Sequence, residues 1–173
     1  MALRSDTFDL SRLGLSSGQG RRLDLSVHIE PFTFGGQTYE VLPELVDARI
    51  DVSRTTADGY ALRLRLAATL EGPCARCLEP ARPGYEVDVF EVHQPGVDDD
   101  ELVSPYMNAD GELDLGRWAR DALALALPAS IVCRPECAGL CAECGANLND
   151  EPGHEHEREP DQRWAKLSEI RFD

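Results

Sequence analysis

Six cysteines and two histidines are the residues whose types and spacing could do chemistry in this chain. Cys74 and Cys77 form a C-x-x-C pair, and a second group contains Cys133, Cys137, Cys141, Cys144, His154 and His156. Thiolates two residues apart are a common way to present adjacent sulfur ligands to tetrahedral zinc. A structural zinc site is therefore the leading interpretation of this pattern.

The sequence leaves the grouping of these ligands open. One option joins Cys74 and Cys77 to Cys141 and Cys144 across the fold, and it is slightly preferred. Another builds a site from the C-terminal cluster alone, with or without His154 or His156. Eight ligands could also fill two sites. Three other readings compete: a redox-active dithiol, an iron–sulfur cluster, and buried cysteines that serve as small hydrophobic residues.

A short pattern in the chain spells H-x-E followed by P-C-x-x-C, the signature of zinc-dependent nucleobase deaminases. It is formed by His28 and Glu30 with residues 73–77. A deaminase would need His28 and Cys74 to share one metal. His28 and Glu30, however, occupy the polar positions of an alternating segment, and residues 73–77 lie between two expected strands. Chance is the better explanation, and no enzyme activity is expected, whether deaminase or thiol oxidoreductase.

Length and hydropathy indicate one domain inside the cell. The 173 residues fit a single domain. No apolar run reaches the roughly 18 residues of a membrane span, and the first 17 residues lack the apolar core of a signal peptide. A cytoplasmic location is expected. Paired cysteines in a reducing compartment favour metal or redox chemistry over disulfides.

The charge balance bears on the kind of partner. There are 32 acidic and 17 basic residues, which gives a formal net charge of −15. This argues against broad binding to a phosphate backbone, and it suits a basic partner. Residues 83–116 contain no Lys or Arg, and their acidic positions are either a solvated loop or a contact surface for a basic protein. The candidate contact residues are Asp98, Asp99, Asp100 and Glu101.

Apolar and polar residues alternate in three segments, at 23–30, 46–52 and 62–70. Such alternation predicts half-buried strands that pair antiparallel. A fourth strand is expected at 85–93, where the apolar positions shift by one residue and predict a bulge. The pair Cys74 and Cys77 falls between the third and fourth strands, so it should cap a β-hairpin.

Two helices complete the expected α+β fold. Asp114 should cap a helix over 115–127 that Pro128 ends, and a last helix is expected over 161–171. Residues 1–20 are expected to form a loosely ordered arm. The domain at 21–173 would be a mainly antiparallel sheet or partly open barrel, with an irregular Cys-rich segment at 133–149.

Several motifs occur in a characteristic order. They are L-E-G-P-C-A-R-C-L at 70–78, G-E-L-D-L at 111–115, L-A-L-A-L-P at 123–128, C-A-G-L-C-A-E-C-G-A-N-L-N at 137–149 and D-Q-R-W-A-K-L at 161–167. This combination resembles the YceD family, the bacterial and plastid group of large ribosomal RNA subunit accumulation proteins. Many relatives carry a further C-x-C after the position of Asn149. His154 and His156 stand near there in this chain and keep the capacity to bind a metal.

The resemblance implies a role in accumulation of the large-subunit (23S) ribosomal RNA. The first hypothesis is a zinc-stabilised, non-enzymatic biogenesis factor that binds a basic ribosomal protein or a large-subunit precursor. The second is a zinc-knuckle protein that binds ribosomal RNA directly, with candidate contacts at Arg76, Arg82 and Arg134.

Overall fold

The computed structural model describes residues 3–4, 6–97, 99–108 and 110–156. The chain forms two compact units, Met1–Cys137 and Ala138–Asp173. All of the strands and helices assigned in the described residues belong to the first unit. None of the helices there is long and apolar enough to cross a membrane.

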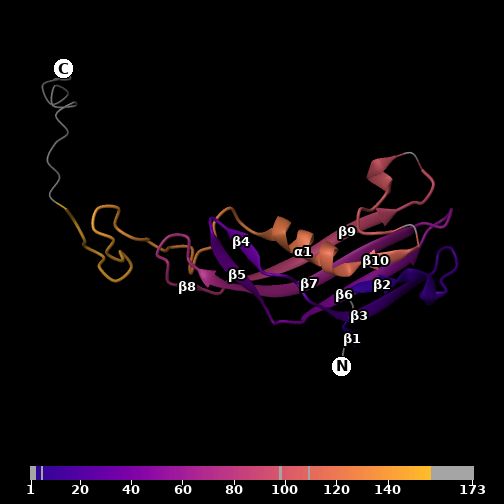
Figure 1. Cartoon of the computed structure of the whole chain (residues 1–173), viewed down its shortest axis with the longest axis horizontal. Coiled ribbons are helices and arrows are strands. Elements are labelled where there is room, and N and C mark those ends of the chain that lie inside the picture. The colour runs from indigo at the N-terminus through magenta and orange to yellow at the C-terminus, as the bar shows by residue number, and fades with distance from the viewer. Residues whose placement is uncertain (1–2, 5, 98, 109, 157–173) are drawn as a thin grey trace, which may run out of the picture. The chain divides into compact units, whose positions relative to one another are not determined.

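The main sheet of the first unit is built on four long antiparallel strands (Figure 1). They are β3 (Gly20–Val27), β6 (Val46–Arg54), β7 (Tyr60–Pro73) and β9 (Gly84–His93), and they lie in the order β3-β6-β7-β9. This pairing confirms the hairpin expected on either side of Cys74 and Cys77.

Shorter strands extend this sheet. β1 (Leu3–Arg4) pairs parallel with β3, while β5 (Gln37–Leu42) and β8 (Pro80–Ala81) pair with the second half of β7. β4 (Phe32–Phe34) forms a small hairpin with β5. A separate pair joins β2 (Thr7–Asp9) to β10 (Glu112–Asp114), and two 3-10 helices occur at Leu10–Leu13 and Asp100–Leu102.

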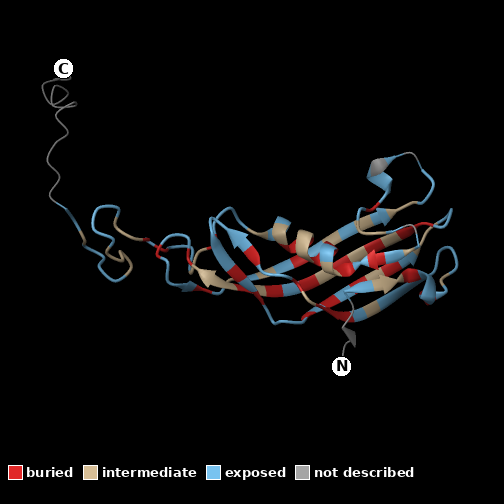
Figure 2. Cartoon of the chain, in the orientation of Figure 1, coloured by how far each residue is buried: buried red, intermediate tan, exposed pale blue. Residues whose placement is uncertain are grey.

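The core lies between one face of the sheet and the helix α1 (Leu115–Ala126). Along β7, every second residue from Tyr60 to Leu70 is buried, as the alternation predicted. α1 packs against β9, β2 and β3 and buries Trp118 and Leu123. Figure 2 shows buried and exposed positions alternating along the long strands, so one face of the sheet is the core side and the other is open.

The start of α1 is set by the predicted cap. The Asp114 carboxylate accepts a hydrogen bond of 2.9 Å from the Arg117 N–H, which satisfies one of the unpaired donors of the first turn. Leu127 has an extended backbone and ends the helix just before Pro128. The expectation of a helix in this part of the chain is confirmed.

Two sequence-based expectations about the fold are wrong. The strands β7 and β9 pair without interruption from Tyr60 opposite His93 to Thr69 opposite Gly84, so β9 has no bulge. Phe90 instead lies on the open face and is 68% exposed. The α+β class is corrected to mainly β with one α-helix in the described residues, because β1, β2, β4, β5, β8 and β10 add strands to the four expected. The helix expected at 161–171 lies outside the described residues.

The segment at 1–20, expected to be an arm, contains β2 and the first 3-10 helix among its described residues. Leu10 and Leu13 of that helix are buried in the core. The Asp9 carboxylate accepts a 2.9 Å hydrogen bond from the Ser11 N–H and caps it. Contacts with β10 and the backbone of Gly111 tie this segment to the connection that leads into α1.

Two leucines on α1 allow a matched test of this packing. Leu123 is fully buried, whereas Leu125 is 86% exposed. We expect Leu123→Ala to lower the free energy of unfolding by about 2–5 kcal/mol, because it removes buried methyl groups and leaves a cavity. Leu125→Ala should change it by less than about 0.5 kcal/mol. Urea unfolding followed by circular dichroism measures both, and equal effects would contradict the assigned face.

Candidate metal centres

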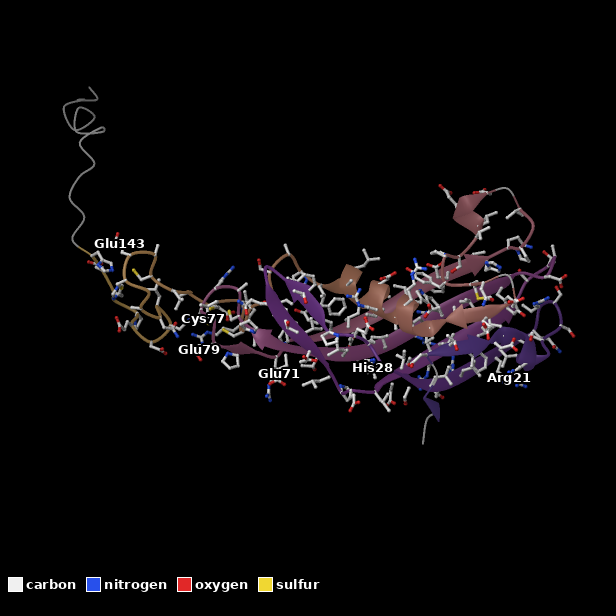
Figure 3. All side chains as sticks on the ribbon, in the orientation of Figure 1. Arg21, His28, Glu71, Cys77, Glu79 and Glu143 are labelled. Carbon is white, nitrogen blue, oxygen red and sulfur yellow. The ribbon has the colours of Figure 1, made fainter. Side chains whose placement is uncertain are left out.

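The first cysteine pair sits in a tight knuckle at the end of β7. The Cys74 N–H donates to the Glu79 carbonyl at 2.8 Å, and the Leu78 N–H donates to the Cys74 carbonyl at 3.0 Å. The Arg76 N–H points at the Cys74 sulfur at 3.4 Å. To close this turn, Leu78 adopts a φ of 64°, a conformation that costs energy for a residue with a Cβ. Figure 3 shows Cys77 and Glu79 on this turn, beyond the end of the sheet.

The strand leading into the knuckle is held by an aromatic ring. The Tyr39 hydroxyl donates to the Pro73 carbonyl at 3.0 Å, and the ring lies so close to Gly72 that any Cβ there would clash with it. Sequence reasoning missed this role of Tyr39. The glycine inside a strand was the available signal, since it often marks a close approach to the backbone.

Two more cysteines reach the first knuckle from the loop that follows α1. The Ala75 N–H donates to the Ile131 carbonyl at 2.8 Å. The Arg76 guanidinium donates to the carbonyls of Pro135 and Cys137, at 3.3 and 3.0 Å. These bonds fix the loop against the hairpin, so the four sulfurs of Cys74, Cys77, Cys133 and Cys137 converge.

The geometry of these four sulfurs, which we call the four-sulfur group, fits a zinc ion. The Cys74 and Cys137 sulfurs are 3.8 Å apart, and those of Cys77 and Cys133 are 3.7 Å apart. A tetrahedral ion with Zn–S bonds of about 2.3 Å places its sulfurs about 3.8 Å from one another. Three of the four residues are buried, as is usual for closed structural sites. The group can therefore hold a metal ion.

The backbone around the four-sulfur group favours the thiolate form of Cys74. Burial opposes charge on Cys74, but N–H groups of the knuckle and of Cys133 outweigh it and lower the pKa of this thiol to about 6. Burial raises the pKa of Cys77 to about 12 and also raises the pKa of Cys133. An anionic Cys74 sulfur at neutral pH gives an arriving cation a first ligand.

The second unit contains a knuckle with the same hydrogen bonds. The Gly145 N–H donates to the Cys141 carbonyl at 2.9 Å, and the Glu143 N–H points at the Cys141 sulfur at 3.4 Å. Gly145 has a φ of 76°, which glycine adopts without strain. Backbone N–H groups of Cys144 and Glu143 lower the pKa of the Cys141 thiol to about 6.

Two imidazoles complete this second set, which we call the Cys₂His₂ group. The Nε2 atom of His156 is 3.2 Å from the Cys141 sulfur, and that of His154 is 3.1 Å from the Cys144 sulfur. The two Nε2 atoms are 2.9 Å apart. All four donor atoms are within 4.8 Å of one another, so they can bind a common ion with small outward shifts.

Each histidine of the Cys₂His₂ group is oriented by a carboxylate. The His154 Nδ1 atom is 2.9 Å from a Glu151 oxygen, and the His156 Nδ1 atom is 3.4 Å from a Glu143 oxygen. Hydrogen bonding to Cys141, with Glu151 adding to it, raises the pKa of His154. A carboxylate on Nδ1 leaves Nε2 free as a ligand, which is the usual outer partner of a metal-bound histidine. Sequence reasoning missed both glutamates, although Glu143 lies inside the C-x-x-C pair.

The structure groups the candidate ligands differently from the set preferred from sequence. Cys74 and Cys77 find Cys133 and Cys137 in their own unit, and Cys141 and Cys144 find His154 and His156 in theirs. The arrangement therefore matches the alternative of eight ligands in two sites. Three residues separate Cys133 from Cys137, so this pair lacks the C-x-x-C signature that marks the other two pairs.

The deaminase pattern does not form one site. The ligand group of Cys74 contains three cysteines beside it and not His28. Figure 3 shows His28 beside the strands of the sheet and well apart from Cys77. His28 lines a surface hollow together with Glu30, Arg120 and Asp121.

The acidic residues and arginines named as candidate partner contacts lie in the following surroundings. Asp99 and Glu101 are exposed, and the Asp99 carboxylate accepts a 3.0 Å bond from the Glu101 N–H. Asp98 lies outside the described residues, and only the backbone of Asp100 is described. Among the arginines of the RNA-binding alternative, Arg82 pairs with Glu71, and Arg134 is exposed.

Comparison with known proteins decides the family. The family model described as "Large ribosomal RNA subunit accumulation protein YceD" matches residues 62–171. The chain belongs to the YceD family. This match covers the hairpin, α1, both C-x-x-C pairs and the two histidines of the Cys₂His₂ group.

Relatives of this YceD protein come from bacteria and plants. An uncharacterized protein of Mycobacterium tuberculosis is 36% identical over 169 residues, which are 95% of this chain and 80% of the relative. A chloroplastic YCED homolog 1 of Zea mays, named as a large ribosomal RNA subunit accumulation protein, is 47% identical over 51 residues. Those residues are 30% of this chain and 17% of the maize protein. No solved structure matches the chain.

Metal uptake tests the two-group arrangement. We expect metal-free protein to take up two Zn²⁺ ions per chain, and the variants Cys137→Ser and Cys144→Ser to take up one each, because each loses one of four ligands. The double variant should take up none. Titration with Zn²⁺ followed by mass spectrometry under native conditions counts the ions. A single ion in the wild type, lost in both single variants, would instead support one shared site.

The two groups should also differ in how fast they release zinc. Three residues of the four-sulfur group are buried, whereas those of the Cys₂His₂ group are half-buried or exposed. We expect a chromogenic chelator to remove one ion in a fast phase and the other in a phase at least about tenfold slower, because a buried ion is less accessible to the competing ligand. The fast phase should be absent in His154→Ala. Two equivalents leaving in one phase would contradict the assignment.

Proposed function

We propose that this YceD protein is a non-enzymatic biogenesis factor of the large ribosomal subunit. It acts in the cytoplasm, binds a basic ribosomal protein or a precursor particle, and so supports accumulation of the 23S ribosomal RNA. Zinc in both ligand groups has a structural role in this proposal. The names of the plant relatives support the link to large-subunit ribosomal RNA.

The net charge of −15 is the observation that carries the choice of partner. The negative electrostatic field of the protein would repel naked RNA, whereas it would attract a basic ribosomal protein. Arg76 and Arg82, which were considered for RNA contact, are already engaged within the protein. The Arg76 guanidinium donates to the loop of the four-sulfur group, and Arg82 pairs with Glu71.

The distribution of charge also supports a basic partner. Residues 83–116 contain no Lys or Arg. Of the acidic side chains described in this stretch, Asp88 alone has an ion pair, with Arg63 at 2.6 Å. Asp99 and Glu101 are exposed. Carboxylates without an internal counter-charge remain available to cations of another molecule.

Depletion in bacteria tests the proposal. Cells that lack the protein should contain a lower ratio of 23S to 16S ribosomal RNA, because large-subunit precursors are no longer protected. Wild-type protein should restore the ratio, and it should co-purify with large-subunit precursors at physiological salt. An unchanged ratio, with no ribosomal component recovered, would refute the proposed function. Tight binding of protein-free 23S fragments would favour direct RNA recognition instead.

A further inference from the structure

The open face of the sheet carries a ladder of cross-strand ion pairs. Register places the outward-facing residues of β3, β6, β7 and β9 in rows that cross all four strands. Four arginines of this face each pair with an aspartate on a neighbouring strand: Arg22 and Arg65 with Asp51, Arg49 with Asp24, and Arg63 with Asp88. These pairs neutralise most of the acidic residues on the face.

One row breaks this pattern. Ser26 is opposite Asp47 on β3 and β6, and Ala67 is opposite Glu86 on β7 and β9. Asp47 and Ala67 come one position after Ala48 and Leu66, the pair that ends the β6–β7 ladder, so the four residues form one row. None of the four is an arginine, and Arg4 of β1 is opposite Ser26 at the far end of the row. Asp47 accepts a 3.2 Å hydrogen bond from the Ser26 hydroxyl, and none of the described cations pairs with it or with Glu86. Both acidic residues are exposed. In the next row, the position equivalent to Ala67 is occupied by Arg65.

The surface is hollowed at this row. A groove of about 960 Å³ crosses the four strands, and its charged walls include Asp47, Arg49, Arg65 and Glu86. Ala67 contributes only a methyl group to the floor, whereas Arg65, the next residue on this face of β7, carries a long side chain. The missing side-chain volume and the missing positive charge therefore coincide.

The spacing of this row suits one guanidinium group. Asp47 and Glu86 lie two strands apart, which corresponds to about 10 Å between their backbones. A group seated over Ala67 would be about 5 Å from each strand, within reach of both side chains. Arginine has five N–H donors in one plane and can bind two carboxylates at once, whereas lysine is a compact point charge.

We propose that this groove binds an arginine side chain of a basic protein partner, seated over Ala67 between Asp47 and Glu86. The partner's arginine would supply a cation between Asp47 and Glu86, where the row has none. In the neighbouring rows the protein's own arginines pair with aspartates. The identity of the partner as a ribosomal protein rests on the proposed function, but the groove and its arginine preference rest on the register of the sheet.

A labelled peptide of ten alternating arginine and alanine residues tests the groove. Its affinity for the full chain, measured by fluorescence anisotropy at low salt, should fall about fivefold in Asp47→Asn/Glu86→Gln, because two ion pairs are lost. The control Glu40→Gln/Glu44→Gln removes the same charge from two exposed positions outside the groove and outside the acidic stretch, and it should change the affinity less than about twofold. Equal losses in the two double variants would overturn the proposal.

A second test places an arginine of the protein itself in the groove and compares it with an arginine placed elsewhere on the same strand. Ala67→Arg should reduce peptide affinity about fivefold, because the new side chain occupies the seat. Ala61→Arg adds the same charge on the same face of β7, three rows away, and should have less than about twofold effect. Circular dichroism verifies that each variant folds. Unchanged affinity in Ala67→Arg would overturn the proposal.

The same variants separate this inference from the proposed function. If wild-type protein co-purifies with large-subunit precursors and Asp47→Asn/Glu86→Gln does not, both stand. If the double variant co-purifies as well as the wild type, the groove is not the docking surface, although the proposed function is retained. If the wild type recovers no ribosomal component, the proposed function fails, and the peptide titration still decides whether the groove binds arginine.

Discussion

The hydrogen-bond ladder along β7 is the constraint on which the first unit depends. This strand pairs with β6 and β9 over its first half and with β5 and β8 near its end. A slip of one residue would turn every buried leucine of β7 to solvent, so the register is strongly specified. That register places Ala67 opposite Glu86 on the open face, one position beyond the end of the β6–β7 ladder and next to Asp47, and it brings Cys74 out of the sheet directly after Pro73. A surface groove and a metal centre thus take their geometry from one strand.

Much of this arrangement could be predicted from local patterns. The alternation around Leu64 identified β7, Asp114 and Pro128 bracketed α1, and the chemistry of sulfur and imidazole identified the eight candidate ligands. The grouping of the ligands could not be predicted, because it depends on which loop reaches which knuckle. Cys133 arrives at the hairpin because the loop after α1 accepts hydrogen bonds from the Ala75 N–H and from the Arg76 guanidinium. The predicted bulge failed for another reason: Phe90 is apolar yet exposed, with the Arg63 guanidinium stacked 4.8 Å from its ring centre.

Each of the two ligand groups contains a knuckle turn of the same kind, but different parts of the chain hold the two turns in place. In the first unit, Leu78 takes the left-handed position that Gly145 takes in the second. The surrounding hairpin and the loop after α1 must offset that cost, since they hold the turn from both sides. The second unit has no strand or helix assigned in its described residues, and its order comes from turns, from Asn149 bonded to the Ala138 N–H, and from the ligands themselves. A bound ion should therefore matter more for the conformation of the second unit than for the sheet.

The boundary between the two units falls directly after a ligand. Cys137 is the last residue of the first unit, and Ala138 begins the second. An ion held by the four sulfurs would clamp the peptide at this junction, and a chain deprived of it would offer the junction to cellular proteases. The lifetime of the chain in the cell would then depend on the supply of zinc.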